Sequence, residues 1–182
     1  AQRKINIMKN KEDILKGLGN PWSHWKTGLV INKLVAKYQP KTFVELGSLD
    51  SFLPELLART YKDLKIIAVD VQFQRPLLWR RYENIFQINN FSVNAARLFN
   101  DESIDFVYVD ALHSYEGCMA DLEAWYPKLK KGGILSGHDY GEHPHKPEPD
   151  FPGVTRAVDE FFNSKNIEIH EEDYMNYWGI KK

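Results

Sequence analysis

Residues 104–140 read IDFVYVDALHSYEGCMADLEAWYPKLKKGGILSGHDY, and this stretch decides the fold. Its first part, 104–111, is rich in β-branched and aromatic residues and predicts a buried strand. Residues 114–130 have the apolar spacing of an amphipathic helix, and the glycines after them suit a helix end. Residues 133–140 predict another strand, so the stretch is typical of an α/β protein with parallel neighbouring strands. The apolar side of the predicted helix consists of Met119, Leu122, Trp125 and Leu129.

The same alternation of strands and helices extends in both directions from this stretch. Each connection between main strands has room for a helix, so we expect five parallel strands that are buried on both faces. The last two strands are close together and predict a terminal hairpin that adds an antiparallel edge. The expected strands are 41–46, 65–71, 84–89, 104–111, 133–140, 167–172 and 176–182, and the expected helices are 21–39, 52–61, 92–99, 114–130 and 154–165.

Length and composition limit the class of protein. The 182 residues fit one domain, which we place at 21–182, after a polar N-terminal arm or loose helix at 1–20. A net charge of -1 excludes a dedicated nucleic-acid binder, and the single cysteine, Cys118, excludes a disulfide framework. We find neither a membrane span nor the apolar segment of a signal peptide, and therefore expect a cytoplasmic protein without nucleic-acid or membrane partners.

Polar residues follow the strands, whereas the strand interiors are apolar. The carboxyl ends of parallel strands meet at one edge of a sheet, and ligands of α/β proteins bind there. We therefore expect a functional site at this edge. The residues that the strands bring there are Glu45, Gly47, Ser48, Asp70, Asn89, Asn90, Ser92, Asp110, His113, His138, Asp139 and Tyr140.

Asp70 and Gly47 indicate a nucleoside ligand. A carboxylate at the end of the second strand can accept both hydroxyls of a ribose, although it could also cap a helix. Gly47 is the only glycine in the turn, so the G-x-G-x-x-G pattern that seats a pyrophosphate is absent. This turn is poor for a dinucleotide but adequate for an adenosyl amino acid; an ordinary strand-to-helix turn is the alternative.

Asp110, His113, His138 and Asp139 come together if the fourth and fifth strands are neighbours. Carboxylates with imidazole suit a divalent cation or a general base. In the alternative interpretation, Asp139 caps the following loop and His138 is a hydrogen-bonded core histidine. Phe91 could lie against an adenine face or pack in the core.

The segments FVELGS, IIAVD, SIDFVYVDALHSYEGCMADLEAWYPKLKKGGILSGHDY and FPGVTRAVDEFF together resemble the class I S-adenosylmethionine-dependent methyltransferases. The match is closest to a small branch with an Asp-x-x-His-Ser-Tyr segment and a Gly-His-Asp-Tyr strand end, and it extends from Trp22 to the C-terminus. The resemblance implies a Rossmann-like, mostly parallel sheet of seven strands with helices on both faces and an antiparallel last strand.

The resemblance also implies the roles of individual residues at the site. Glu45 and Gly47 face the methionine portion of S-adenosylmethionine, and Ser48 beside them belongs to the same cofactor site. Asp70 holds the ribose hydroxyls, and Asp110 lies under the sulfonium. The segment that borders the adenine is Asn90, Phe91 and Ser92.

Related metal-dependent O-methyltransferases carry one acid after the fourth strand and an acidic pair after the fifth. Asp110 and Asp139 match two of these positions, and His138 replaces the third, which favours a borderline metal or no metal. We therefore predict Asp110, His138 and Asp139 as the candidate metal ligands. Two further departures are Ser51, where a second glycine is common, and Phe91, where an acid is common.

The predicted function is O-methylation of a small-molecule hydroxyl, with a sugar as the preferred substrate class. His113 or Asp139 would remove the proton from the acceptor. Two alternatives stay open: a metal-dependent hydroxylase of small metabolites, and a methyltransferase-like binding module without turnover. The terminal hairpin with Tyr177 and Trp178 favours a homodimer.

Overall fold

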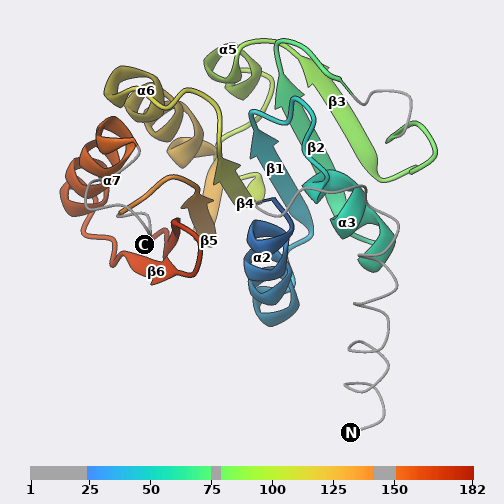
Figure 1. Ribbon diagram of the computed structural model, residues 1–182, viewed down its shortest axis with the longest axis horizontal. Coiled ribbons are helices and arrows are strands. Elements are labelled where there is room, and N and C mark those ends of the chain that lie inside the picture. The colour runs from blue at the N-terminus through green and yellow to red at the C-terminus, as the bar shows by residue number, and fades with distance from the viewer. Residues whose placement is uncertain (1–23, 75–78, 142–150) are drawn as a thin grey trace, which may run out of the picture.

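The computed structural model describes residues 24–74, 79–141 and 151–182 (Figure 1). These residues form a seven-stranded sheet in the order β3-β2-β1-β4-β5-β7-β6. Its strands are β1 Thr42–Leu46, β2 Lys65–Asp70, β3 Ile85–Asn89, β4 Ile104–Val109, β5 Leu129–Gly137, β6 His170–Glu172 and β7 Asn176–Ile180. The helices are α2 His24–Tyr38, α3 Leu53–Thr60, α5 Ser92–Ala96, α6 Tyr115–Trp125, η1 Tyr126–Lys128 and α7 Pro152–Ser164.

The strand pairing confirms the predicted fold class. Strands β1 to β5 are all parallel to one another. Strand β7 lies between β5 and β6 and is antiparallel to both. Strands β1 and β4 are hydrogen-bonded neighbours although β2 and β3 separate them in sequence. The order of the sheet therefore reverses between β1 and β4, and the carboxyl ends on the two sides of this point carry the polar residues.

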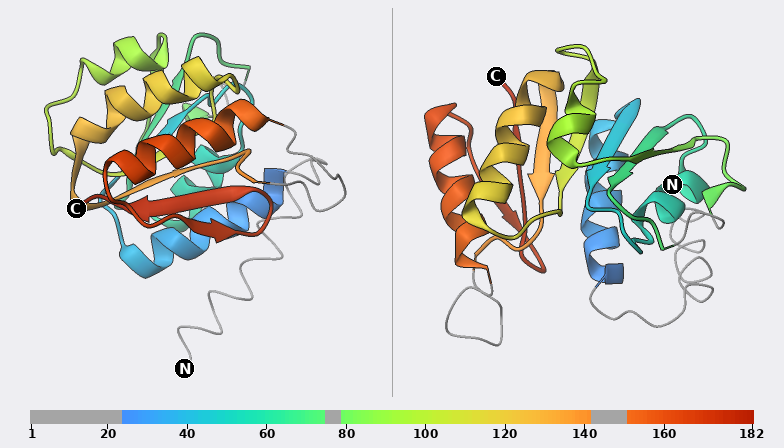
Figure 2. Two further views of the ribbon diagram at one scale, coloured as in Figure 1. Left: turned by 90° about the vertical axis from the view of Figure 1, so that its left-hand side faces the viewer. Right: turned by 90° about the horizontal axis from the view of Figure 1, so that it is seen from above.

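Helices cover both faces of the sheet (Figure 2), and the sequence of each strand alternates between the two cores. In β4, Val107 and Val109 pack with α5, α6 and α7, whereas Phe106 and Tyr108 pack with α2 and α3. Side chains of a strand point alternately to its two faces, and here both faces are apolar. This burial of both faces explains why the strands appear in the sequence as continuous apolar runs.

One predicted helix is shorter than expected. Helix α6 ends at Trp125, and Leu129 lies at the start of β5 instead of on the apolar side of the helix. Pro127 stands in the 3-10 turn between them, where its missing N–H and its ring prevent the α-helix from continuing. Leu129 is buried in the same core as Leu122. The apolar pattern in the sequence therefore continues past the end of the helix.

The predicted arm at 1–20 and most of the loop at 141–153 lie outside the described residues. The terminal hairpin is confirmed, with its turn at residues 173–175. Within the described ranges, no helix has the length and apolar character needed to cross a membrane.

Candidate functional site

Two cavities open beside the carboxyl ends of the parallel strands. The larger, called the groove, has a volume of about 380 Å³, and the smaller, called the pocket, has a volume of about 200 Å³. Asp110 and His113 line both cavities, so the two meet at the end of β4. The groove is lined by six of the eight predicted cofactor residues, which are Gly47, Asp70, Asn90, Phe91, Ser92 and Asp110.

Apolar side chains of the groove are unusually exposed. Leu49 is 39% exposed, Val71 53%, Leu112 65% and Phe91 67%, and all four line this one cavity. A concentration of exposed apolar groups in a hollow marks a surface that a ligand covers. Phe91 therefore lies at the groove, and core packing, one of its two sequence interpretations, does not apply.

Asp70 ends β2 at the floor of the groove. Its Oδ2 accepts a hydrogen bond from the N–H of Leu49, and its Oδ1 accepts one from the N–H of Gln72, both at 2.9 Å. A carboxylate offers about four acceptor positions, so two remain for hydroxyl groups of a ligand. The two bonds fix the carboxylate in orientation and tie the turn after β1 to the end of β2.

Gly47 is required because another part of the chain approaches it closely. Its φ is +84°, and a Cβ there would lie 1.9 Å from the carbonyl oxygen of Asp110. The close approach is thus to the chain itself, at the end of β4, and not only to a ligand. Gly47 and Ser48 also donate their N–H groups to the carbonyl oxygen of Val69, at 2.9 and 3.2 Å. The turn is therefore packed between β2 and β4.

Glu45 is a buried acid at the border of the pocket. Its two carboxylate oxygens accept hydrogen bonds of 2.7 Å from the hydroxyls of Ser48 and Ser51. Burial raises the pKa of Glu45 to about 8, although the two hydroxyls oppose the shift. Ser51, which departs from the glycine of the related proteins, thus has a defined partner. Ser48 is fully buried beneath the turn and lines neither cavity.

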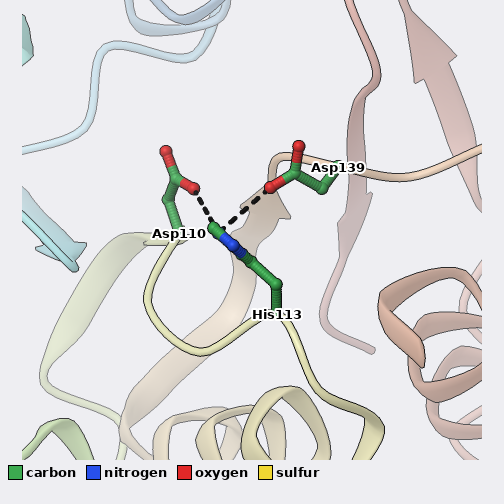
Figure 3. Close-up of side chains that lie close together, drawn as sticks. All are labelled: Asp110, His113 and Asp139. Carbon is green, nitrogen blue, oxygen red and sulfur yellow. Dashed lines mark hydrogen bonds and ion pairs between the residues drawn. The ribbon is translucent and has the colours of Figure 1, made fainter. Parts of the chain in front are cut away.

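Asp110, His113 and Asp139 form a cluster in the pocket (Figure 3). The Nε2 of His113 lies 3.4 Å from an oxygen of Asp110 and 3.1 Å from an oxygen of Asp139. The hydrogen bond to Asp110, together with the charge of Asp139, raises the pKa of His113 against the effect of its partial burial. One ligand atom from each of the three residues lies within 4.8 Å of the others, so the cluster could hold a metal ion.

His138 lies beside this cluster and not within it. Its Nδ1 is 3.0 Å from Asp139, and it also hydrogen-bonds the backbone of Tyr174 in the turn of the terminal hairpin. Burial lowers the pKa of His138, but the bond to Asp139 and the charges of Asp110 and Asp139 leave it raised. The structure thus assembles His113, and not the predicted His138, with the two acids; the set of metal ligands stays a prediction.

Asp139 is held in a backbone conformation that few residues adopt. Its φ is 61°, in the left-handed region, and its side chain is 5% exposed. Aspartate tolerates this region better than most residues, and such strain is common at functional sites. The conformation turns the carboxylate of Asp139 toward His113 directly after β5 ends at Gly137.

The remaining wall of the pocket was missed by the sequence analysis. Phe151 packs against His113 in a tilted arrangement, with 4.5 Å between the ring centroids, and it lies just before α7, far from His113 in sequence. The residues of this wall carry no recognisable signal in the sequence, because they are ordinary core or helix-cap residues whose position depends on packing. The missed residues are Thr27, Ser51, Phe52, Leu53, Tyr108 and Phe151.

Comparison with known proteins agrees with this arrangement. A family model described as a methyltransferase domain matches residues 44–140. A comparison with curated proteins found no match.

Similar solved structures share the fold at low sequence identity. They include a candidate caffeoyl-CoA O-methyltransferase from Staphylococcus aureus, with a TM-score of 0.68 and 13% identity over 98% of this chain and 92% of that chain. A SAM-dependent methyltransferase from Aquifex aeolicus has a TM-score of 0.61 and 16% identity over 83% of this chain and 89% of that chain. A candidate O-methyltransferase from Klebsiella pneumoniae has a TM-score of 0.64 and 12% identity over 86% and 80%, respectively.

The family match covers more than half of the chain, from Val44 in β1 to Tyr140 after β5. It contains the turn at Gly47, the groove acid Asp70 and the two acids of the cluster. The strand order and the antiparallel β7 are those that the resemblance in sequence implies. The chain therefore belongs to the class I S-adenosylmethionine-dependent methyltransferase family.

Proposed function

We propose that the protein is an S-adenosylmethionine-dependent methyltransferase that methylates a hydroxyl group of a small molecule. The observation that carries this proposal is the meeting of two cavities at Asp110 and His113. An apolar groove with a carboxylate suits a nucleoside, and a small pocket with acids and an imidazole suits an acceptor that must lose a proton. A donor in one cavity and an acceptor in the other would react at their junction.

The residues of the groove fit the cofactor. Its volume of about 380 Å³ is in the range of small-molecule sites, and Phe91 offers a flat apolar surface for a base. Asp70 has free acceptor positions for ribose hydroxyls. The contact of Glu45 with the methionine portion stays a prediction, since Glu45 lines the pocket and not the groove. When bound, S-adenosylmethionine supplies a methyl group on a positively charged sulfur.

The chain itself supplies orientation and a base. His113 lies where both cavities meet, and its Nε2 faces two carboxylates that favour the protonated imidazole. We assign the neutral form of His113 as the base that takes the proton of the acceptor hydroxyl on its other ring nitrogen, Nδ1, because Nε2 faces the two acids; Asp139 is the alternative base. Asp110 and Asp139 hold the ring and stabilise the charge that it gains.

The pocket limits the size of the acceptor. Its volume of about 200 Å³ admits roughly one ring, since cavities of about 150 Å³ are known to accept benzene. Phe52, Leu53 and Phe151 provide apolar wall in the same pocket as the charged cluster. A sugar fits such a division, because its ring has an apolar face and its hydroxyls meet the acids. Sugars remain our preferred substrate class.

A divalent cation would be held by Asp110, His113 and Asp139, whose donor atoms lie close together. A mixed set of carboxylate and imidazole ligands suits manganese, iron or zinc better than magnesium. When bound, such an ion lowers the pKa of a hydroxyl that touches it. In that state, His113 would act as a ligand, and proton removal would pass to another group.

The proposal is tested first by binding and then by turnover. We expect calorimetry to detect binding of S-adenosylhomocysteine, and Asp70→Ala to weaken it by about 10- to 100-fold because hydrogen bonds to a charged group are lost. Asp63→Ala, an exposed acid before β2, is the matched control. Absence of heat and of a thermal shift at millimolar ligand would overturn the proposal.

Turnover is then followed as S-adenosylhomocysteine release with a panel of hydroxyl-bearing small molecules that includes sugars. The panel is run with the metal-free protein and after addition of magnesium, manganese, iron or zinc. Stimulation by one ion that Asp139→Asn abolishes supports the metal site, and equal rates in all conditions contradict it. The homodimer and the cytoplasmic location stay predictions, for which native mass and cell fractionation are the measurements.

A binding module without turnover is the second candidate. It is favoured by the turn after β1, since the Leu49 N–H already occupies Asp70 and Gly47 is packed against Asp110. In this case, the groove would bind cofactor while no acceptor or metal gives turnover. Retained cofactor affinity with no product from the whole panel is the result that this candidate predicts.

A further inference from the structure

Asp121, on the buried side of α6, is an acid with an unusual lack of partners. It is 1% exposed, and one of its carboxylate oxygens accepts a very short hydrogen bond from the hydroxyl of Ser92. The other oxygen, Oδ2, is buried with no hydrogen-bond partner among the described residues. Burying an unpaired carboxylate oxygen is costly, so the presence of an acid here calls for an explanation.

The fold does not need this acid to hold Ser92 in place. Ser92 is the first residue of α5, and its carbonyl oxygen accepts a hydrogen bond of 3.1 Å from the indole N–H of Trp125. The indole thus fixes the backbone of Ser92 independently of Asp121. The bond from Ser92 to Asp121 therefore acts mainly on the direction of the serine hydroxyl.

The direction of this hydroxyl determines what Ser92 offers to the groove that it lines. An ionised carboxylate can only accept, so the hydroxyl proton of Ser92 is committed to Asp121, and its oxygen retains only lone pairs. Burial raises the pKa of Asp121 to about 6, which still leaves it mostly ionised at pH 7.5. The amino group at position 6 of a purine donates hydrogen bonds, whereas the oxygen of a 6-oxo purine accepts them at the same position.

We infer that Asp121 is a positioning residue that sets Ser92 as a hydrogen-bond acceptor, and that the groove thereby selects a 6-amino purine over a 6-oxo purine. The inference rests on the proposed cofactor function of the groove. Ser92, Asn90 and Phe91 line the end of the groove beside β3, next to Asp70. A base bound there lies next to a ribose held by that acid.

The test compares the affinities for S-adenosylhomocysteine and S-inosylhomocysteine at pH 7.5 by calorimetry. The wild type is expected to prefer the adenosyl compound by about 10- to 100-fold, because an acceptor facing an acceptor leaves both unpaired. Asp121→Leu has the same branching at the side-chain end but carries no acceptor, so the hydroxyl of Ser92 is freed to donate into the groove. We expect its preference to fall below about threefold.

Two further variants keep the test decisive. Ser92→Ala removes the acceptor itself and is expected to reduce the preference to a few-fold, and it decides the outcome if Asp121→Leu does not fold. Glu123→Gln, an exposed acid on the same helix, is the matched control and should keep the preference of the wild type. A circular dichroism melt of each variant establishes that it is folded.

The outcomes separate the inference from the proposed function. If the wild type binds neither compound, the cofactor role of the groove fails, and the inference fails with it. If the wild type binds the adenosyl compound but a folded Asp121→Leu variant keeps the same preference within twofold, only the inference is overturned. Unchanged preference in Ser92→Ala overturns it as well.

Discussion

The groove and the pocket share one edge of the sheet but differ in how they are built. The groove consists of strand ends and turns, with exposed apolar side chains such as Phe91 and Leu112 and one fixed acid, Asp70. The pocket gathers charged side chains, namely Asp110, His113 and Asp139, against residues from distant helices. The groove is therefore a shape that the backbone provides, and the pocket is an arrangement of side chains.

This difference separates the general part of the site from the specific part. The similar structures share this fold at 12–16% identity, so the strand ends and turns that build the groove do not depend on a shared sequence. The chemistry and the choice of acceptor depend on a few side chains placed by packing. Changes in the pocket should thus affect turnover and leave cofactor affinity unchanged, and changes in the groove should do the opposite.

The largest effect on turnover is expected for His113→Ala, which tests whether a change in the pocket lowers the rate and leaves cofactor binding in the groove unchanged. Loss of a positioned base lowers the rate of methyl transfer by about 10²- to 10⁴-fold. The Kd for S-adenosylhomocysteine should stay within about threefold, since His113 lies only at the margin that the cavities share. Single-turnover rates with an acceptor from the panel and calorimetry measure the two quantities.

The matched control for this variant is His170→Ala, a histidine that stacks on Trp178 at the far edge of the sheet. It should leave both quantities unchanged. A His113→Ala enzyme with the wild-type rate would contradict the assignment of the base, and Asp139 would then be the candidate.

Gly47→Ala should damage both cavities at once, because Gly47 joins the turn of the groove to the end of β4. A Cβ would overlap the carbonyl of Asp110 in addition to the strain of a positive φ. We expect the free energy of unfolding to fall by about 3 kcal/mol or more and cofactor binding to be lost. Chemical denaturation and calorimetry are the measurements.

Gly132→Ala provides the comparison for Gly47→Ala. Gly132 also has a positive φ, +76°, but a Cβ there meets nothing within 4 Å. Only the strain of about 1 to 2 kcal/mol remains, and cofactor affinity should not change. Equal losses of stability in the two variants would show that the contact with Asp110 is unimportant.

The sequence predicts the groove better than the pocket for a physical reason. Strand periodicity gives the sheet, and the sheet by itself brings Gly47, Asp70 and Ser92 to one edge. No such rule places Phe151 on His113, because that contact depends on how α7 packs against α6. The position of His113 between both acids, whereas His138 reaches only Asp139, likewise depends on side-chain directions that periodicity does not determine.

Glu45 lies in the wall of the pocket, and the pH dependence of stability tests its protonation state. Its carboxyl keeps a proton in the folded chain up to a pKa of about 8, whereas the unfolded chain releases it near 4.5. The folded state thus binds more protons between these values, and stability must fall as the pH rises from 4.5 to 8. Relative to the wild type, Glu45→Gln should gain about 3 kcal/mol of stability between pH 5 and 7.5.

Urea denaturation of both proteins across this pH range measures the gain, and other titrating groups cancel in the difference. Glu168→Gln, an exposed acid, should follow the wild type at every pH. A Glu45→Gln variant that runs parallel to the wild type would mean that Glu45 is already ionised in the folded protein.

The smallest effect is expected for Phe91→Ala, which affects the groove alone. Phe91 is 67% exposed and packs little against the protein, so the free energy of unfolding should change by less than about 0.5 kcal/mol. Stacking of an aromatic ring on a base contributes about 1 to 3 kcal/mol, so the Kd for S-adenosylhomocysteine should rise by roughly 10-fold. Leu98→Ala is a close control, because Leu98 is also 67% exposed but does not line the groove. If both variants bind the cofactor like the wild type, the exposed apolar surface of the groove does not hold the base, and the cofactor must lie elsewhere along this edge.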